Sequence, residues 1–139
     1  MTTLHDPNPG VADTDPAKYV DAETFPYIVF PGGFFAIQGS GGWGDVVLGR
    51  SLTTGRQSAA LVGDEGGTNE PLGEISLSLA ARLGGDNPNP RTGAGSPSGP
   101  FQYLVFPRSH RDPGWPRSLQ DVERQAASLL QAIGGWPKV

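Results

Sequence analysis

The sequence has no cysteine, and it has only two histidines among its 139 residues. Without cysteine, a disulfide framework, a thiol nucleophile and a thiolate metal site are excluded, while the redox compartment stays open. His5 lies in a polar N-terminal stretch and His110 in a loop rich in Pro and Arg. We interpret both as surface residues, because they form no convincing metal site or Ser/His/Asp triad.

Long apolar runs, a signal peptide and basic clusters are also missing. No run approaches the length that spans a membrane, and the first residues lack a basic start followed by an apolar stretch. We expect a secreted or exported protein whose signal was removed or was never needed. The net charge of −4 and the scattered Lys and Arg argue against nucleic acid as a partner, and we expect no membrane partner.

Turn-forming residues are abundant, with 21 Gly and 14 Pro. Short apolar runs recur between them, which favours a turn-rich β fold over disorder. A chain of this length can bury one core and little more. We therefore predict a single domain over residues 19–139, preceded by a flexible polar lead-in at residues 1–18.

Short runs rich in Val, Ile, Phe and Tyr, bounded by Gly, Pro and Ser, predict strands. These runs are Tyr27–Phe30, Phe34–Ile37, Asp45–Leu48, Ser58–Val62 and Phe101–Phe106. Pro31-Gly32-Gly33 predicts a tight reversal, and Thr53-Thr54-Gly55 predicts a hairpin loop. The middle of the chain therefore reads as a β-meander.

Two segments show helical periodicity. Apolar residues at Leu72, Ile75, Leu79 and Leu83 lie on one helical face, which ends at Gly84-Gly85. A second helix begins at the N-cap Ser118 and ends at Gly134-Gly135. The stretch 86–100 has almost no apolar residue, and we favour a surface loop there over a flap that covers substrate.

Two five-residue runs, Tyr27–Pro31 and Tyr103–Pro107, are near copies. They suggest a pseudo-twofold arrangement, although five residues are thin support for a duplication. Closure into a barrel would remove the exposed edges of so many short strands. The predicted fold is mainly β, of the α+β class: a small six-stranded double-psi-like β-barrel with two flanking helices.

The segment from Leu61 to Leu79 carries the strongest chemical signal. Asp64 and Glu74 each follow a glycine, the first at the end of a strand-like run and the second in the first turn of the predicted helix. Such a pair can do acid/base work. From spacing alone the simpler interpretation is favoured, in which Asp64 opens a turn and Glu74 complements a helix N-terminus.

The sequence motifs around the two carboxylates favour a catalytic role for them. Val62-Gly63-Asp64-Glu65-Gly66, followed after a polar loop by Gly73-Glu74-Ile75-Ser76-Leu77-Ser78-Leu79-Ala80, resembles the core motif of the fungal-type chitosanases, glycoside hydrolase family 75. Weaker similarity runs from about Phe25 to Trp136, through Pro26–Pro31, Gly44–Val47, Leu83-Gly84, Tyr103–Pro107 and Gly134–Trp136. The loop between the two motifs carries Asn69, Glu70 and Pro71, and it has Gly66-Gly67 where the family often has Gly-Pro, which bears on substrate preference.

The resemblance implies that Asp64 and Glu74 are the two catalytic acids of an inverting glycosidase that uses no cofactor or metal. An inverting pair stands about 6.5–9.5 Å apart, with a water between the base and the sugar. A carboxylate in the first turn of a helix is favoured in its ionised form, which favours Glu74 as the base and Asp64 as the acid and leaves the reverse assignment open.

Further residues are candidates for substrate binding. Asp45 can support the pair or contact a substrate amine, and Ser76 can orient a carboxylate or bind a sugar hydroxyl; a turn aspartate and a plain helix serine are the simpler interpretations. Sugar rings present apolar faces that stack on aromatic side chains. Trp43, Tyr103 and Trp115 are the candidate platforms, and each can instead be a core residue.

These features predict a cofactor-free glycosidase that cuts inside β-1,4-linked glucosamine polymers such as chitosan. Peptidoglycan has a related β-1,4 amino-sugar backbone, so a wall-lytic effector or toxin module is one alternative, with an immunity protein as its partner. A non-catalytic carbohydrate-binding or interaction module is the other. Release of reducing ends or of muropeptides would separate the three.

Overall fold

The computed structural model describes residues 1–67, 73–89 and 91–138. Two short 3₁₀-helices, four strands and two α-helices follow one another along the chain. In order they are η1 (Pro16–Lys18), β1 (Tyr27–Phe30), η2 (Phe34–Ala36), β2 (Val46–Ser51), β3 (Gln57–Glu65), α1 (Leu77–Arg82), β4 (Phe101–Phe106) and α2 (Leu119–Ala132). No helix in this described part of the chain is long and apolar enough to cross a membrane.

The strands form one mixed sheet in the order β1-β3-β2-β4. Strand β1 is parallel to β3, whereas β2 is antiparallel to both β3 and β4. Strands β1, β3 and β4 therefore run in one direction. Their carboxyl ends lie at the same end of the sheet as the start of β2, so the loops that follow them gather there.

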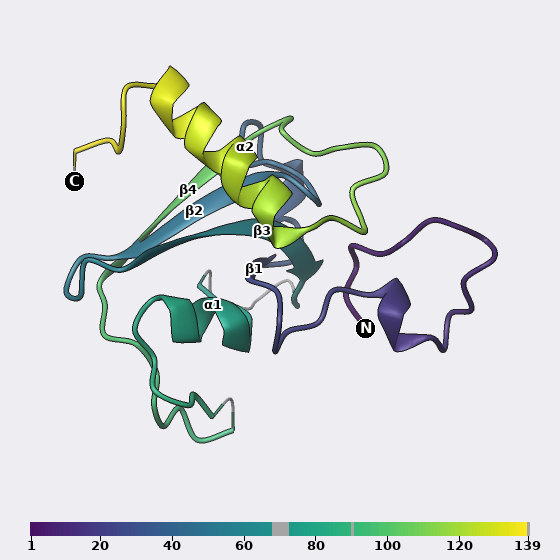
Figure 1. The fold of residues 1–139 in the computed structure, drawn as a ribbon, viewed down its shortest axis with the longest axis horizontal. Coiled ribbons are helices and arrows are strands. Elements are labelled where there is room, and N and C mark those ends of the chain that lie inside the picture. Colours follow the sequence, from purple (N-terminus) through teal and green to yellow (C-terminus); the bar gives the residue numbers. More distant parts are fainter. Residues whose placement is uncertain (68–72, 90, 139) are drawn as a thin grey trace.

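Each face of the sheet is covered by one helix, α2 on one side and α1 on the other (Figure 1). Val122 and Ala126 of α2 belong to a buried cluster with Val46 and Leu61. Leu79 of α1 belongs to a second cluster, which includes Val47 and Val62 on the opposite face. Burial on both faces explains why the strands β2 and β3 read as continuous apolar runs rather than alternating ones.

The structure confirms a mixed α/β protein with two flanking helices, but not the predicted six-stranded barrel. The described residues form an open, four-stranded sheet with β1 and β4 at its edges. The predicted strand Phe34–Ile37 was wrong, because these residues form the 3₁₀-helix η2 after Gly33, whose φ of 85° lies in the left-handed region. The β2–β3 hairpin of the predicted meander is present, but β1 joins the sheet by parallel pairing.

The near-copy segments are not related by twofold symmetry. A twofold axis through the middle of the sheet would give β1–β3 and β4–β2 the same relative direction. The first pair is parallel and the second antiparallel. β1 and β4 have similar sequences because both are apolar edge strands, and a proline follows each of them.

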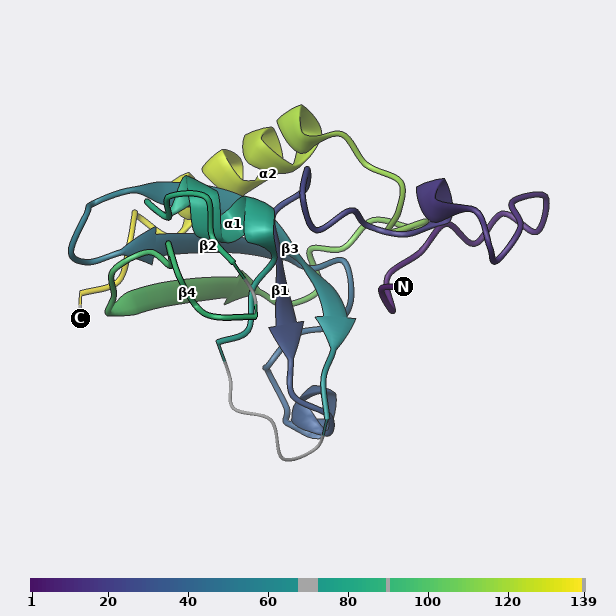
Figure 2. The ribbon, with the colours of Figure 1, turned by 90° about the horizontal axis from the view of Figure 1, so that it is seen from below.

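The N-terminal residues, which we predicted to be a flexible lead-in, contribute to the core. Leu4 is 7% exposed and packs in the cluster beneath α2. The hydroxyl of Thr2 accepts a hydrogen bond from the backbone N–H of Val20, and His5 forms a β-bridge with Tyr19. Residues 6–18 reach out from the sheet between these two anchors (Figure 2).

Both helices begin at a serine N-cap. The Oγ of Ser118 accepts from Asp121 N at 3.1 Å, as predicted for α2. Helix α1 begins at Leu77 after the N-cap Ser76, so Glu74 lies before the helix and not in its first turn. The stretch 86–100, of which Pro90 is not described, is anchored by Ser51 and Thr53 at the end of β2. The two bonds hold Ser98 and Gly99 at the end of the sheet opposite to Asp64, which favours the predicted surface loop over a flap at Asp64.

Candidate active site at the carboxyl end of the sheet

A β-bulge sets the direction of the Asp64 side chain. Ile28 pairs with Val62 and Val29 with Asp64, so Gly63 is an extra residue on β3 without a partner on β1. In a regular strand Asp64 would share the face of Val62. Bulges re-aim the side chains that follow them. Asp64 instead lines the same cavity as Tyr27, on the opposite face.

The carboxylate of Asp64 is held by one of its two oxygens. Its Oδ1 accepts hydrogen bonds from Thr3 N at 3.0 Å, Thr3 Oγ1 at 2.9 Å and Glu65 N at 2.9 Å. Its Oδ2 receives no hydrogen bond from the residues that the structure describes. Thr3 was not predicted as a site residue, because its proximity to Asp64 depends on where the N-terminal segment packs.

Glu74 lies on the other side of β1 from Asp64. The backbone O of Glu74 accepts from Val29 N at 2.9 Å, and Ile75 forms a bridge with Ile28. Val29 thus has Asp64 on one side and Glu74 on the other. Neighbouring strands lie about 4.8 Å apart, so two such spacings put the Cα atoms of Asp64 and Glu74 roughly 10 Å apart. Glu74 lies outside α1, so the helix dipole gives no reason to assign it as the base.

The hydroxyl of Tyr27 is affected by the negative charges of both Asp64 and Glu74. Its side chain is buried, with 8% exposed. Burial, followed by the negative charges of Asp64, Glu74 and Asp21, raises the pKa of the Tyr27 hydroxyl above its ordinary value. The phenol therefore stays a hydrogen-bond donor at neutral pH. Sequence reasoning missed Tyr27, since its position beside the carboxylates depends on the parallel β1–β3 pairing.

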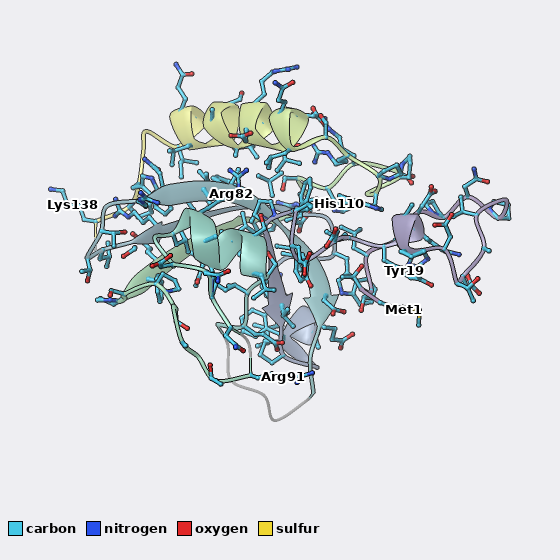
Figure 3. The ribbon with its side chains drawn as sticks, turned by 60° about the horizontal axis from the view of Figure 1, so that its bottom comes forward. Met1, Tyr19, Arg82, Arg91, His110 and Lys138 are labelled. Carbon is cyan, nitrogen blue, oxygen red and sulfur yellow. The ribbon has the colours of Figure 1, made fainter. Side chains whose placement is uncertain are left out.

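Asp64 and Tyr27 line a cavity of about 860 Å³ under the N-terminal segment. Its lining combines the carboxylates of Asp13, Asp21 and Asp64 with the aromatic rings of Tyr19, Phe25, Tyr27 and Trp115. No Lys, Arg or His is among the described lining residues, but the carboxylate of Asp13 is paired with Lys18 at 2.5 Å. Figure 3 shows Met1 and Tyr19, which also line it, at the end of the molecule opposite to Lys138.

Glu74 lines a separate, smaller cavity of about 260 Å³. Phe34, Ser40 and Tyr103 share this cavity, and most of its wall is apolar. The structure thus places Asp64 and Glu74 on neighbouring segments around Tyr27, but their side chains line different cavities. A chain of sugars that contacts both must pass across the end of β1.

Ser76 has a structural role, and it is not available for the predicted contact with a sugar. It is 3% exposed, and its Oγ accepts from Tyr27 N at 2.9 Å and Leu79 N at 3.2 Å. The same hydroxyl donates to Phe25 O at 3.0 Å. One donor and two acceptor positions are all that a serine hydroxyl offers. No capacity is left for a sugar.

The three predicted aromatic platforms differ in exposure. Trp115 is 8% exposed and packs edge-on against Phe25, with a ring distance of 4.9 Å, so it forms the cavity floor rather than an open surface. Trp43 is 43% exposed and lies against Phe35, which leaves part of its indole open to a sugar. Tyr103 is half-buried in the Glu74 cavity, and burial raises the pKa of its hydroxyl.

Asp45 is buried, with 1% exposed, so it does not contact a substrate amine directly. Its Oδ2 accepts from the backbone N–H groups of Gly42 at 2.7 Å and Arg108 at 3.2 Å. Its Oδ1 accepts from His110 N at 2.9 Å and pairs with His110 Nδ1 at 2.8 Å. His110 lies at the surface as predicted, with half of its side chain exposed, but its link to Asp45 gave no sequence signal.

The remaining expectations for this region are partly outside the described residues. Asn69, Glu70 and Pro71 of the polar loop, and Leu72 of the predicted helical face, are among them. Within the described residues, no group of three or more His, Cys, Asp or Glu is placed to hold a metal ion. No protein-family model matches the chain, and no curated protein matches it. The candidate site therefore rests on its geometry.

Proposed function

We propose that this protein is a glycoside hydrolase that cuts inside β-1,4-linked glucosamine polymers, with Asp64 and Glu74 as its two carboxylates. The observation that carries the proposal is the arrangement around β1. The bulge at Gly63 and the bridge at Ile75 put the two carboxylate residues on either side of Val29. After burial, the charges of Asp64, Glu74 and Asp21 raise the pKa of the Tyr27 hydroxyl, so both carboxylates lie within electrostatic range of the same phenol.

The chemistry needs one carboxylic acid to protonate the leaving oxygen and one carboxylate to activate water or attack the sugar. Oδ2 of Asp64 has no hydrogen-bond partner among the described residues, and the side chain of Glu74 is exposed, so both can reach a substrate. An inverting reaction, with water entering opposite the leaving group, is part of the proposal. It would require a carboxyl separation of about 6.5–9.5 Å in the complex.

The composition of the larger cavity supports an amino-sugar substrate. The carboxylates of Asp21 and Asp64 attract the ammonium groups of glucosamine, whereas Asp13 is paired with Lys18, and the aromatic rings offer surfaces for sugar faces. The fold enters the proposal only as a mixed α/β structure. A double-psi-like barrel would need more strands than the four of the described residues.

The test is reducing-end release from soluble chitosan, with peptidoglycan in parallel. We expect Asp64→Asn and Glu74→Gln each to lower the rate by about 100-fold or more, the usual contribution of a general acid or base. Glu65→Gln is the matched control, because Glu65 is an exposed acid directly beside Asp64. Its activity should stay near wild type.

Each other outcome has a defined meaning. Cleavage of peptidoglycan alone would identify a wall-lytic enzyme. Binding without cleavage, in a folded protein, would identify a carbohydrate-binding module. If both variants keep wild-type rates on chitosan, the assignment of Asp64 and Glu74 is wrong. An aryl glycoside with a good leaving group separates the two roles, because it restores activity to the acid variant and not to the base variant.

A further inference from the structure

The Asp45–His110 pair is the strongest chemical feature outside the proposed catalytic pair. Three partners of the Asp45 carboxylate are backbone N–H groups, which can only donate. The fourth partner is Nδ1 of His110, at 2.8 Å from Oδ1. A carboxylate that accepts from all of its partners assigns the donor role to this ring nitrogen. The other nitrogen, Nε2, is then an acceptor in the neutral imidazole.

The backbone around His110 is shaped by the same carboxylate. Arg108 has a φ of 64°, which is uncommon for a residue with a Cβ, and its N–H points to Asp45. Asp45 thus fixes both the loop and the orientation of the ring. A buried acid that orients a half-exposed imidazole is an arrangement that presents one defined ring nitrogen to a ligand.

His110 lines a cavity of about 520 Å³. Phe35, Ile37 and Pro107 provide apolar surface there, while Gln38 provides a polar amide. Asp45 also lines it from below, and Arg108 is the other charged lining residue. The carboxylate of Asp45 accepts from Nδ1 of His110, which leaves Nε2 as the acceptor, so the pair favours a ligand group that donates a hydrogen bond.

This cavity adjoins the cavity of Glu74. Gly41 separates them: a Cβ at this position would lie 2.9 Å from Val105 Cγ1 and 3.2 Å from Asp45 Oδ2. Val105 lines the Glu74 cavity and Asp45 the cavity of His110. Phe34 and Phe35, which are consecutive in η2, likewise line one cavity each. A polymer bound at Glu74 can therefore extend past η2 toward His110.

We infer that the cavity of His110 is a subsite for one amino-sugar unit of the polymer, in which Nε2 accepts a hydrogen bond from the ammonium or a hydroxyl group. This inference rests on the proposed function for its substrate class. Phe35 and Pro107 contact the apolar face of the sugar ring. Asp45 does not touch the sugar and only orients His110. His110 is a binding residue and takes no part in the bond cleavage.

The test is calorimetric binding of a soluble glucosamine oligomer together with steady-state kinetics on chitosan. We expect His110→Ala to weaken binding about 10-fold and to raise KM by a similar factor, with kcat unchanged. His110→Gln places an amide near the position of Nε2 and should recover part of the affinity. Arg111→Gln is the matched control, because Arg111 is an exposed residue of the same loop that does not line the cavity.

The outcomes keep this inference distinct from the proposed function. If the wild type binds the oligomer and cleaves nothing, while His110→Ala binds more weakly, the subsite stands and the hydrolase proposal fails. If the wild type cleaves chitosan and a folded His110→Ala variant has the same affinity and KM, the subsite is wrong. A loss of affinity in Arg111→Gln equal to that in His110→Ala would also overturn it, because a disturbance of the shared loop would then explain both.

Discussion

The ring of Tyr27 lies directly on the backbone of Gly63. A methyl group at position 63 would be 2.8 Å from both Cβ and Cγ of Tyr27. The same Gly63 is the unpaired residue of the bulge that turns Asp64 toward the cavity. Gly63 thus has two roles in the tertiary structure. It makes room for the ring of Tyr27, and its bulge redirects the carboxylate of Asp64.

Gly63→Ala should destabilise the protein and displace Tyr27. The added methyl group must push the ring or the strand, which costs about 1–3 kcal/mol in a packed interior. Urea unfolding measures this loss. Gly10→Ala is the control, because there only the flexible side chain of Asn8 comes within 4 Å. Equal stability of the Gly63→Ala variant and the wild type would show that the ring is not confined by the strand.

Ser76→Ala should cost more than Ser118→Ala, although both serines are N-caps. Loss of an N-cap alone costs about 1 kcal/mol, which we expect for Ser118. Removing the Ser76 hydroxyl also leaves the buried N–H of Tyr27 without its acceptor, which adds about 1–3 kcal/mol. Chemical denaturation of the two variants provides the comparison. Equal losses would mean that the Tyr27 N–H finds another acceptor.

Tyr27 should make the folded state less stable at alkaline pH. Its folded pKa is raised above 10.0, first by burial and then by Asp64 and Glu74. Above pH 10 the unfolded chain releases the phenol proton while the folded chain keeps it, so stability falls as the pH rises further. The unfolding free energies of the wild type and of Tyr27→Phe, measured from pH 8 to 11, should diverge above about pH 10.

Tyr103 provides an internal reference for this alkaline effect. Burial alone raises the pKa of Tyr103, whereas neighbouring carboxylates add to the effect at Tyr27. Added salt screens charges and leaves burial unchanged. The titration of Tyr27, followed by absorbance in a background in which Tyr19 and Tyr103 are both replaced by Phe, should therefore shift downward with salt. A salt-independent titration would contradict the proximity of the carboxylates.

Asp121→Asn should destabilise the start of α2. Arg117 is nearly buried, at 3% side-chain exposure, and its Nη2 donates to Asp121 Oδ2 at 2.7 Å. The carboxylate is 41% exposed, so solvent screening limits the loss to roughly 1 kcal/mol. The hydrogen bond and charge of Arg117 lower the pKa of Asp121 below 3.8.

The pH dependence of this variant follows from that shift. A lowered folded pKa contributes stability that is present above pH 3.8 and is lost as the pH falls through the folded value. The stability difference between the wild type and Asp121→Asn should therefore shrink below about pH 3.8. Acid unfolding curves measure it, and a difference that persists at the lowest pH would show that charge is not its cause.

Local elements were largely readable from the sequence. The strands Tyr27–Phe30 and Phe101–Phe106 and the helix capped by Ser118 have the predicted bounds, and the hairpin of β2 and β3 is present. Each of these depends on neighbours a few residues apart: apolar runs, turn residues or a cap. The same local cues wrongly predicted a strand at Phe34–Ile37, because they do not show whether a partner strand is available.

The amino-acid order by itself determined where most strands and helices form, and it singled out Asp64 and Glu74 as carboxylates that follow glycines. Only the tertiary structure decided that β1 pairs in parallel with β3, that the bulge at Gly63 turns Asp64 toward Tyr27, and that Asp45 holds His110. The physical reason is the range of the interactions. Turns, caps and periodicity act over a few residues, whereas strand register and buried hydrogen bonds join segments that are distant in the chain and take their positions only when the core packs.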